Sequence, residues 1–267
     1  MKSSLISTAL ALCAVSMSAA NTKDITFTSP NGNLNIYISL KSATPQYTVY
    51  EGEIKDRNVY ALDNAMALEF EGMGKDSYTI SAPKRIKEHF EAPLYKTVSF
   101  SDEYNQVILK SKNGVNIEFR AYNSGVAYRF FTSSSKKEWT IKNEIATFNF
   151  ADDKVAYLPY STNPKNPKAM AFQATYDAVN LTNLKELEAF LPATVDCGKA
   201  KVTILETDVE DYPGMYLLPY KEKSSMIRIG GQSTPGLKGE FAKKPKTFDY
   251  YPWRKQKYVT STEDCIA

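Results

Sequence analysis

Residues 119 to 130 read Phe119-Arg120-Ala121-Tyr122-Asn123-Ser124-Gly125-Val126-Ala127-Tyr128-Arg129-Phe130. Apolar and polar side chains alternate on both sides of the central Asn-Ser-Gly, and a period of two places every second side chain on the same face of a strand. Asn, Ser and Gly are residues that tight turns favour. The stretch therefore predicts two antiparallel strands joined by a short turn, with one face buried and the other partly exposed.

The preceding residues extend this hairpin into a three-stranded meander. Val107 and Leu109 alternate in the same way, and Lys112-Asn113-Gly114 separates them from the first strand of the quoted stretch. Asn-Gly readily adopts the positive φ angles of a tight hairpin turn. Further strands are predicted over residues 34–40, 140–150, 201–207, 215–218 and 225–229. So many strands predict an all-β fold, a large antiparallel β-sandwich of two stacked sheets with few short helices.

Only one segment has a helical spacing of apolar residues. These residues are Leu181, Leu184, Leu187 and Phe190. The spacing predicts a short amphipathic helix, which Leu191-Pro192 must end because proline cannot continue a helix.

The first twenty residues have the features of a secretory signal peptide. Lys2 precedes an apolar run from Leu5 to Val15, and Ser18-Ala19-Ala20 supplies the small residues of a cleavage site. The run is too short to cross a bilayer as a stable helix. We therefore expect a soluble, exported protein, secreted or periplasmic, with no membrane span.

Charge and composition narrow the class of partner. The chain has 33 lysine and arginine residues against 30 aspartate and glutamate residues, a net charge of +3. This balance gives no strong field for nucleic acid or an anionic membrane, so a neutral partner is expected. The single histidine, His89, excludes a zinc site of several histidines and is expected in a loop or at a strand end.

Several short motifs follow one another along the chain. They are Ser29-Pro30-Asn31-Gly32-Asn33-Leu34, Glu91-Ala92-Pro93-Leu94-Tyr95, Tyr104-Asn105, Glu144-Ile145-Ala146-Thr147-Phe148, Glu206-Thr207-Asp208, Asp211-Tyr212-Pro213-Gly214-Met215 and Pro252-Trp253-Arg254. Each motif is common by itself, but the ordered set resembles the N-terminal domain of family 97 of the glycoside hydrolases, of the α-glucosidase and α-galactosidase type. In that family the domain precedes a catalytic barrel and forms part of the wall of its sugar pocket.

The resemblance implies that the catalytic residues lie outside this chain. In the family both catalytic carboxyl groups belong to the barrel, which needs roughly 250 further residues. We expect one β-sandwich domain over residues 21–254, a divergent tail over residues 255–267, and a missing barrel. No catalytic residue is therefore assigned, and the chain alone is expected to be inactive.

The resemblance also implies a calcium site in the full-length family. A glutamate that ligates calcium there aligns with Gln173, within Phe172-Gln173-Ala174-Thr175-Tyr176. Glutamine keeps a neutral oxygen but loses the charge, and calcium affinity falls with ligand charge. Calcium binding is therefore expected to be weakened or absent here, and the alternative is that Gln173 is an ordinary loop amide.

Aromatic side chains are the candidates for sugar contact, because a flat ring suits the apolar face of a pyranose and a polar tip suits its hydroxyl groups. They are Tyr157, Tyr160, Phe172, Tyr176 and Trp253. Of these, Phe172, Tyr176 and Trp253 are predicted to bind substrate.

Glu206 is the fourth predicted substrate-binding residue. Together with Asp208 and Glu210 it alternates in an extended segment, which would place three carboxylates on one face. The alternative is a charged strand edge that deters unwanted pairing.

The sequence therefore predicts a carbohydrate-binding, noncatalytic N-terminal domain of a secreted family 97-type glycoside hydrolase, with an α-glucoside or α-galactoside as its partner. The alternative is a truncated fragment that serves only as a structural or interaction domain. A basic segment with nearby aromatic residues, Lys243-Lys244-Pro245-Lys246, suggests nucleic-acid binding, but the expected export argues against it.

Overall fold

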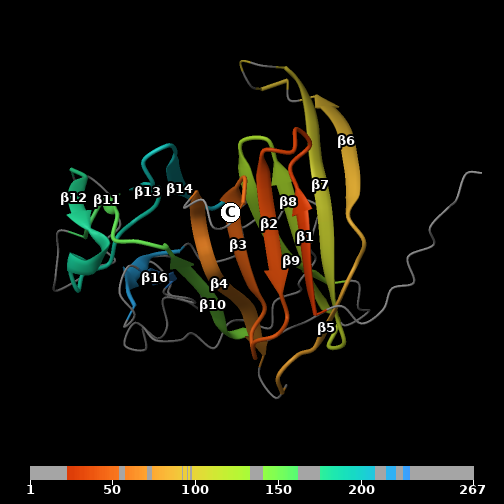
Figure 1. Ribbon diagram of the computed structural model, residues 1–267, viewed down its shortest axis with the longest axis horizontal. Helices are drawn as coiled ribbons and strands as arrows, with labels where there is room; N and C mark the ends of the chain where they lie inside the picture. Colours follow the sequence, from red (N-terminus) through yellow and green to blue (C-terminus); the bar gives the residue numbers. More distant parts are fainter. Residues whose placement is uncertain are drawn as a thin grey trace, which may run out of the picture.

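The computed structural model of the chain describes residues 23–53, 58–70, 74–91, 93–94, 96, 98–132, 141–161, 175–207, 215–220 and 225–228. Within these residues the chain consists of antiparallel strands and a single 3-10 turn, which confirms the all-β prediction (Figure 1). The predicted signal peptide and the tail lie outside the described residues. None of the described residues belongs to a helix that is long and apolar enough to cross a membrane.

The strands are β1 (Asp24–Thr28), β2 (Leu34–Ser39), β3 (Gln46–Glu51), β4 (Val59–Phe70), β5 (Tyr78–Ile80), β6 (Lys84–Glu91), β7 (Ser99–Ser111), β8 (Val115–Tyr122), β9 (Gly125–Thr132), β10 (Ile141–Asn149), β11 (Val155–Leu158), β12 (Asp177–Asn180), β13 (Ala193–Asp196), β14 (Lys201–Ile204), β15 (Leu217–Pro219) and β16 (Ser225–Arg228). They form a seven-stranded sheet in the order β1-β2-β3-β4-β10-β16-β15, a five-stranded sheet in the order β5-β7-β8-β9 with β6 paired to β7, and a four-stranded sheet in the order β12-β11-β13-β14. In Figure 1 the four-stranded sheet lies to one side of the other two.

The quoted stretch forms β8, a two-residue turn and β9, as its alternation predicts. Phe119 lies opposite Tyr128, and Ala121 lies opposite Val126. Phe119 is fully buried and packs in a core to which β1 to β4 contribute from the facing sheet, including Ile36. The two sheets are therefore the layers of a β-sandwich, and burying these side chains is its main source of stability.

Glycines with positive φ occupy the turn before β2 and the turn after β7. Gly32 has a φ of 77° and Gly114 a φ of 94°, which a residue with a Cβ adopts only at a cost. The hydroxyl oxygen of Ser111 accepts hydrogen bonds from the N–H groups of Asn113 (2.8 Å) and Gly114 (3.0 Å). The carboxylate of Asp76 accepts one in turn from the Ser111 hydroxyl at 2.5 Å. Local sequence and a contact distant in sequence thus fix the β7–β8 hairpin together.

A second core lies between the four-stranded sheet and the strands β10, β15 and β16. It includes Phe148 of β10, Val195 of β13 and Leu217 of β15, which are each almost fully buried. Strand β10 pairs with β4 on one side and with β16 on the other. The seven-stranded sheet therefore runs from the first core to the second.

The predicted helix over residues 181–190 is wrong. Only Leu181–Asn183 forms a single 3-10 turn, and the backbone is extended again at Leu184 (φ −57°, ψ 139°). Ala189 then bridges as a short extended segment between Tyr160 and Leu217. A helix cannot offer its backbone groups to two neighbouring strands in this way, because its own hydrogen bonds already use them.

The apolar residues of that segment are nevertheless in contact with the second core. Leu181 is 3% exposed, and Leu184 and Leu187 pack against the same cluster. The carboxylate of Asp153 accepts hydrogen bonds from the backbone N–H (3.0 Å) and the hydroxyl (2.9 Å) of Thr182. The spacing of the leucines therefore indicates which side chains are buried. The backbone conformation is set by the contact between Asp153 and Thr182.

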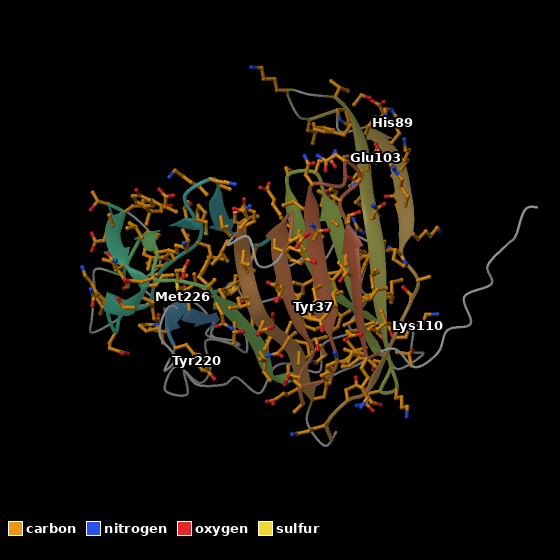
Figure 2. All side chains as sticks on the ribbon, in the orientation of Figure 1. Tyr37, His89, Glu103, Lys110, Tyr220 and Met226 are labelled. Atoms are coloured by element: carbon orange, nitrogen blue, oxygen red, sulfur yellow. The ribbon has the colours of Figure 1, made fainter. Side chains whose placement is uncertain are left out.

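Strands β6 and β7 extend past the end of β8 as a two-stranded ribbon, which we call the β6–β7 arm (residues 86–91 and 99–104). The pairing between β7 and β8 covers residues 105–109 of β7 only, whereas β6 pairs with β7 as far as Ser99. Every side chain of β6 except Ile86 is exposed. His89 and Glu103 lie on the arm (Figure 2), so His89 is in a strand, two residues before its end.

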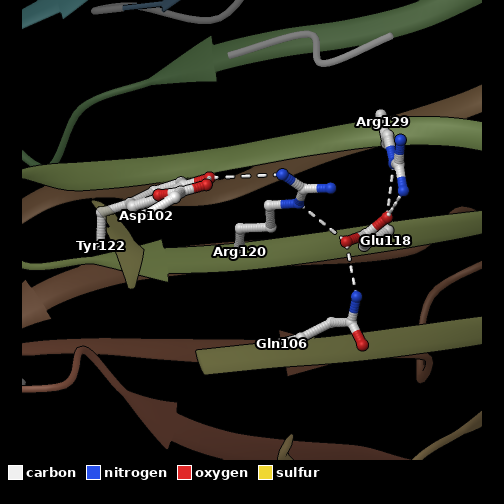
Figure 3. A network of polar contacts seen from close by, with 6 residues as sticks. All are labelled: Asp102, Gln106, Glu118, Arg120, Tyr122 and Arg129. Carbon is white, nitrogen blue, oxygen red and sulfur yellow. Dashed lines mark hydrogen bonds and ion pairs between the residues drawn. The ribbon is translucent and has the colours of Figure 1, made fainter. Parts of the chain in front are cut away.

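The face of β8 that points away from the core is buried, which differs from the predicted partly exposed face. Glu118 is 1% exposed there, Arg120 8% and Arg129, on the neighbouring β9, 7%. One carboxylate oxygen of Glu118 accepts hydrogen bonds from Arg120 Nε (2.8 Å) and Gln106 Nε2 (2.6 Å), and the other contacts Arg129 (Figure 3). The guanidinium of Arg120 also lies over the ring of Tyr104, at 4.5 Å from its centroid. Polar side chains of β7, β8 and β9 thus shield one another from solvent on this face of the sheet.

Candidate carbohydrate-binding site

The four-stranded sheet brings two of the predicted substrate-binding residues to the same end. The register pairs nearest this end are Leu158 with Asp177, Tyr157 with Thr194, and Ala193 with Ile204. Tyr176 comes directly before β12 and Glu206 two residues after β14. Because neighbouring strands are antiparallel, both residues lie at this end, on opposite edges of the sheet. We call it the sheet end.

Tyr176 presents an exposed ring at the sheet end. Its side chain is 44% exposed, and its hydroxyl donates a hydrogen bond to the carbonyl oxygen of Pro192 at 3.3 Å. The phenol oxygen is therefore fixed to the chain that enters β13, while part of the ring faces solvent. A held, exposed ring is the geometry that stacking on a sugar requires.

Tyr160, in contrast, is part of the second core. It is 6% exposed, and its hydroxyl oxygen accepts a hydrogen bond from the backbone N–H of Lys185 at 3.2 Å. Burial raises the pKa of its phenol. The ammonium of Lys185 lies 5.1 Å from the centre of the ring and 2.5 Å from a carboxylate oxygen of Asp177. The ring of Tyr160 is therefore covered and is not available to stack on a sugar. Tyr157 on β11 is half-buried.

Glu206 holds two parts of the chain together at the other edge of the sheet end. One of its carboxylate oxygens accepts a hydrogen bond from the backbone N–H of Met215 at 2.5 Å. Asp208 and Glu210 lie outside the described residues, so the predicted row of three carboxylates stays a prediction.

Phe172, Gln173 and Trp253 also lie outside the described residues. The described chain stops at Ser161, next to Tyr160, and resumes at Thr175, next to Tyr176. Both junctions of the segment that carries Phe172 and Gln173 are therefore at the sheet end. Among the residues that the structure describes, no group of three or more histidine, cysteine, aspartate or glutamate side chains could hold a metal ion, and the calcium site stays a prediction.

Comparison with known proteins identifies the family. The sequence matches the Glycosyl-hydrolase 97 N-terminal family over residues 27–264. The chain belongs to this family. It is 31% identical over 285 aligned positions to a retaining alpha-galactosidase of Bacteroides thetaiotaomicron; the alignment takes in 96% of this chain and 41% of that relative. The family 97 domain therefore spans less than half the length of the curated relative that it matches.

Solved structures share its fold. A Glycoside Hydrolase Family 97 enzyme from Pseudoalteromonas sp. strain K8, in complex with acarbose, superposes with a TM-score of 0.59 at 18% identity over 76% of this chain and 31% of that one. The same enzyme has been solved with panose. A beta-arabinopyranosidase superposes with a TM-score of 0.64 at 16% identity, over 76% of this chain and 35% of that one. At these identities the likeness establishes the architecture only.

The family 97 domain also contains a groove that the sequence did not indicate. It has a volume of about 440 Å³ and lies between β14, the β3–β4 hairpin and the β8–β9 turn. Its walls come from segments far apart in sequence, and each lining residue taken singly resembles an ordinary core or turn residue. No local pattern could therefore reveal it.

Proposed function

We propose that this chain binds carbohydrate, as a noncatalytic N-terminal domain of a secreted family 97 glycoside hydrolase. The observation that carries the proposal is the exposed ring of Tyr176, held at the sheet end by its hydrogen bond to Pro192. The segment that contains Phe172 and Gln173 joins the described chain at the same end. Family membership favours a sugar as the ligand of such a ring.

An α-glucoside or α-galactoside is the proposed ligand class. The curated relative is a retaining alpha-galactosidase, and structures of a family 97 enzyme contain panose or acarbose. Neither a strong charge nor a metal is needed to hold a neutral sugar. The ring of Tyr176 contacts the apolar face of a pyranose, and the carboxylate of Glu206 accepts hydrogen bonds from its hydroxyl groups.

Hydrolysis requires two carboxyl groups at a controlled separation across the glycosidic bond. We assign these two carboxyl groups to the part of a family 97 enzyme that this chain does not cover. The domain then contributes binding and orientation of the sugar. Gln173 would offer calcium one neutral oxygen, and no step of the proposed function involves the metal.

Calorimetric titration with panose and with melibiose tests the proposal. We expect millimolar or tighter binding that Tyr176→Ala weakens about tenfold, equivalent to about 1.4 kcal/mol. Tyr220→Ala is the matched control, because Tyr220 is 41% exposed and follows β15, which belongs to another sheet. If neither sugar binds, the domain has a structural or interaction role instead. If Tyr176→Ala and Tyr220→Ala lose equal sugar affinity, Tyr176 is not the binding residue.

A further inference from the structure

The walls of the groove come from two segments that are far apart in sequence. One wall is formed by residues 200–205, which contain β14, and the opposite wall by residues 122–127 of the β8–β9 turn. Within the described residues β14 is the outermost strand of its sheet. The volume of about 440 Å³ lies within the usual range of small-molecule sites.

The floor of the groove is apolar and its rim is polar. Val49, Phe148 and Ile204 line the groove and are largely buried. Asn123 and Thr203, at the rim, are exposed. A ligand with an apolar face and hydroxyl groups at its edge matches this distribution.

Two hydrogen-bonded pairs supply polar groups inside the groove. The hydroxyl of Tyr60 donates to a carboxylate oxygen of Glu51 at 2.9 Å, and the amide of Asn64 donates to the hydroxyl oxygen of Tyr47 at 3.2 Å. Burial, together with the hydrogen bond and charge of Glu51, raises the pKa of Tyr60 to about 12. The phenol therefore stays protonated at neutral pH and remains a donor.

The ion pairs and hydrogen bonds of the groove argue against an anionic ligand. The ammonium group of Lys201 pairs with Asp196, and one oxygen of Glu51 already accepts from Tyr60. No described cation in the groove is left to select an anion. The other carboxylate oxygen of Glu51 and the amide of Asn123 suit the hydroxyl groups of a neutral molecule.

We propose that the groove is a second carbohydrate site, which takes one or two residues of a neutral oligosaccharide. Val49 and Phe148 contact the apolar face of the sugar, and Glu51 and Asn123 bind its hydroxyl groups. Strand β14 forms one wall and continues directly to Glu206 at the sheet end, so the groove adjoins the edge of the sheet opposite Tyr176. The choice of a sugar rests on the proposed function, whereas the position of the site rests on the groove.

Two glycines allow a matched test. A Cβ atom added at Gly125, which lines the groove, meets no atom within 4 Å, and the same is true at Gly74, which lines a different hollow. Gly125→Leu therefore adds a bulky side chain at the groove from a Cβ position that meets no neighbour, and Gly74→Leu adds the same side chain elsewhere.

The measurement is a titration of the methyl-labelled domain with panose, followed by NMR. We expect shifts of the methyl signals of Val49, Val126 and Val202, and a loss of about tenfold or more in this affinity in Gly125→Leu but not in Gly74→Leu. Shifts confined to the surroundings of Tyr176, or unchanged affinity in Gly125→Leu, overturn the groove site and leave the proposed function intact. The absence of any shift at saturating panose overturns both.

Discussion

The buried carboxylate of Glu118 gives the sharpest prediction about stability. Glu118→Gln keeps the size of the side chain but removes the charge that faces Arg120 and Arg129. All three residues are almost fully buried. Removing one partner of a buried ion pair costs about 3–5 kcal/mol, because the opposite charge stays in a medium of low polarity. At 2–4 °C for each kcal/mol in a chain of this size, we expect the Tm to fall by roughly 6–20 °C.

The matched control is Glu103→Gln on the β6–β7 arm. Glu103 also contacts two cations, Arg85 and Lys87, but all three side chains are at least 35% exposed. Solvent screens such pairs, so little stability is lost. Thermal unfolding followed by circular dichroism, with urea unfolding at 25 °C, measures both variants. Equal losses in the two variants would refute the claim that the buried network matters.

The pH dependence of the unfolding free energy of wild type and of Glu118→Gln supplies a second test. Burial raises the pKa of Glu118, but the hydrogen bonds from Arg120 and Gln106 and the charges of both arginines outweigh it, so the pKa is lowered from 4.5. A lowered carboxyl pKa stabilises the fold above the unfolded value and loses that contribution as the pH falls through the folded value. The stability difference between wild type and Glu118→Gln must therefore be constant near neutral pH and shrink below about pH 4.5. A difference that grows on acidification would contradict this sign.

Three further predictions concern the hairpins. Asp76→Asn removes the charged acceptor of the Ser111 hydroxyl, and urea unfolding should show a loss of about 2 kcal/mol. Gly114→Ala places a side chain on a residue with a φ of 94° and should lower the free energy of unfolding by about 1–2 kcal/mol in the same assay. Gly125→Ala is the control and should lower it less, because the φ of Gly125 is not positive. Hydrogen exchange should be faster in the β6–β7 arm than in β8, because a two-stranded ribbon alone is marginal in water; equal protection would show that the arm is held as firmly as the core.

The alternation of residues 119–130 was enough to predict β8, β9 and the core face between them, because period two and turn residues are local properties. It could not predict that the opposite face of β8 is buried. That burial depends on Gln106 and Arg129, which reach Glu118 from the neighbouring strands. Charged residues at alternate positions look solvent-exposed in sequence, and only the pairing register brings opposite charges together.

The segment at residues 181–190 shows the opposite case. The spacing of its leucines correctly indicated burial but not the backbone, since Ala189 is held in an extended conformation between Tyr160 and Leu217. At the candidate site, Tyr176 and Glu206 were named from sequence and do lie at one end of a sheet. The groove was missed because its floor joins β3, β4, β10 and β14, and a single-sequence pattern contains no information on how they meet.

We propose that this family 97 domain binds an α-linked sugar without cleaving it. Saturation-transfer NMR on panose mixed with the purified chain observes both parts in one sample. We expect transfer from protein to sugar protons, reduced in Tyr176→Ala, with no new anomeric signals on prolonged incubation. The absence of transfer at millimolar panose, or the appearance of hydrolysis products, would contradict it.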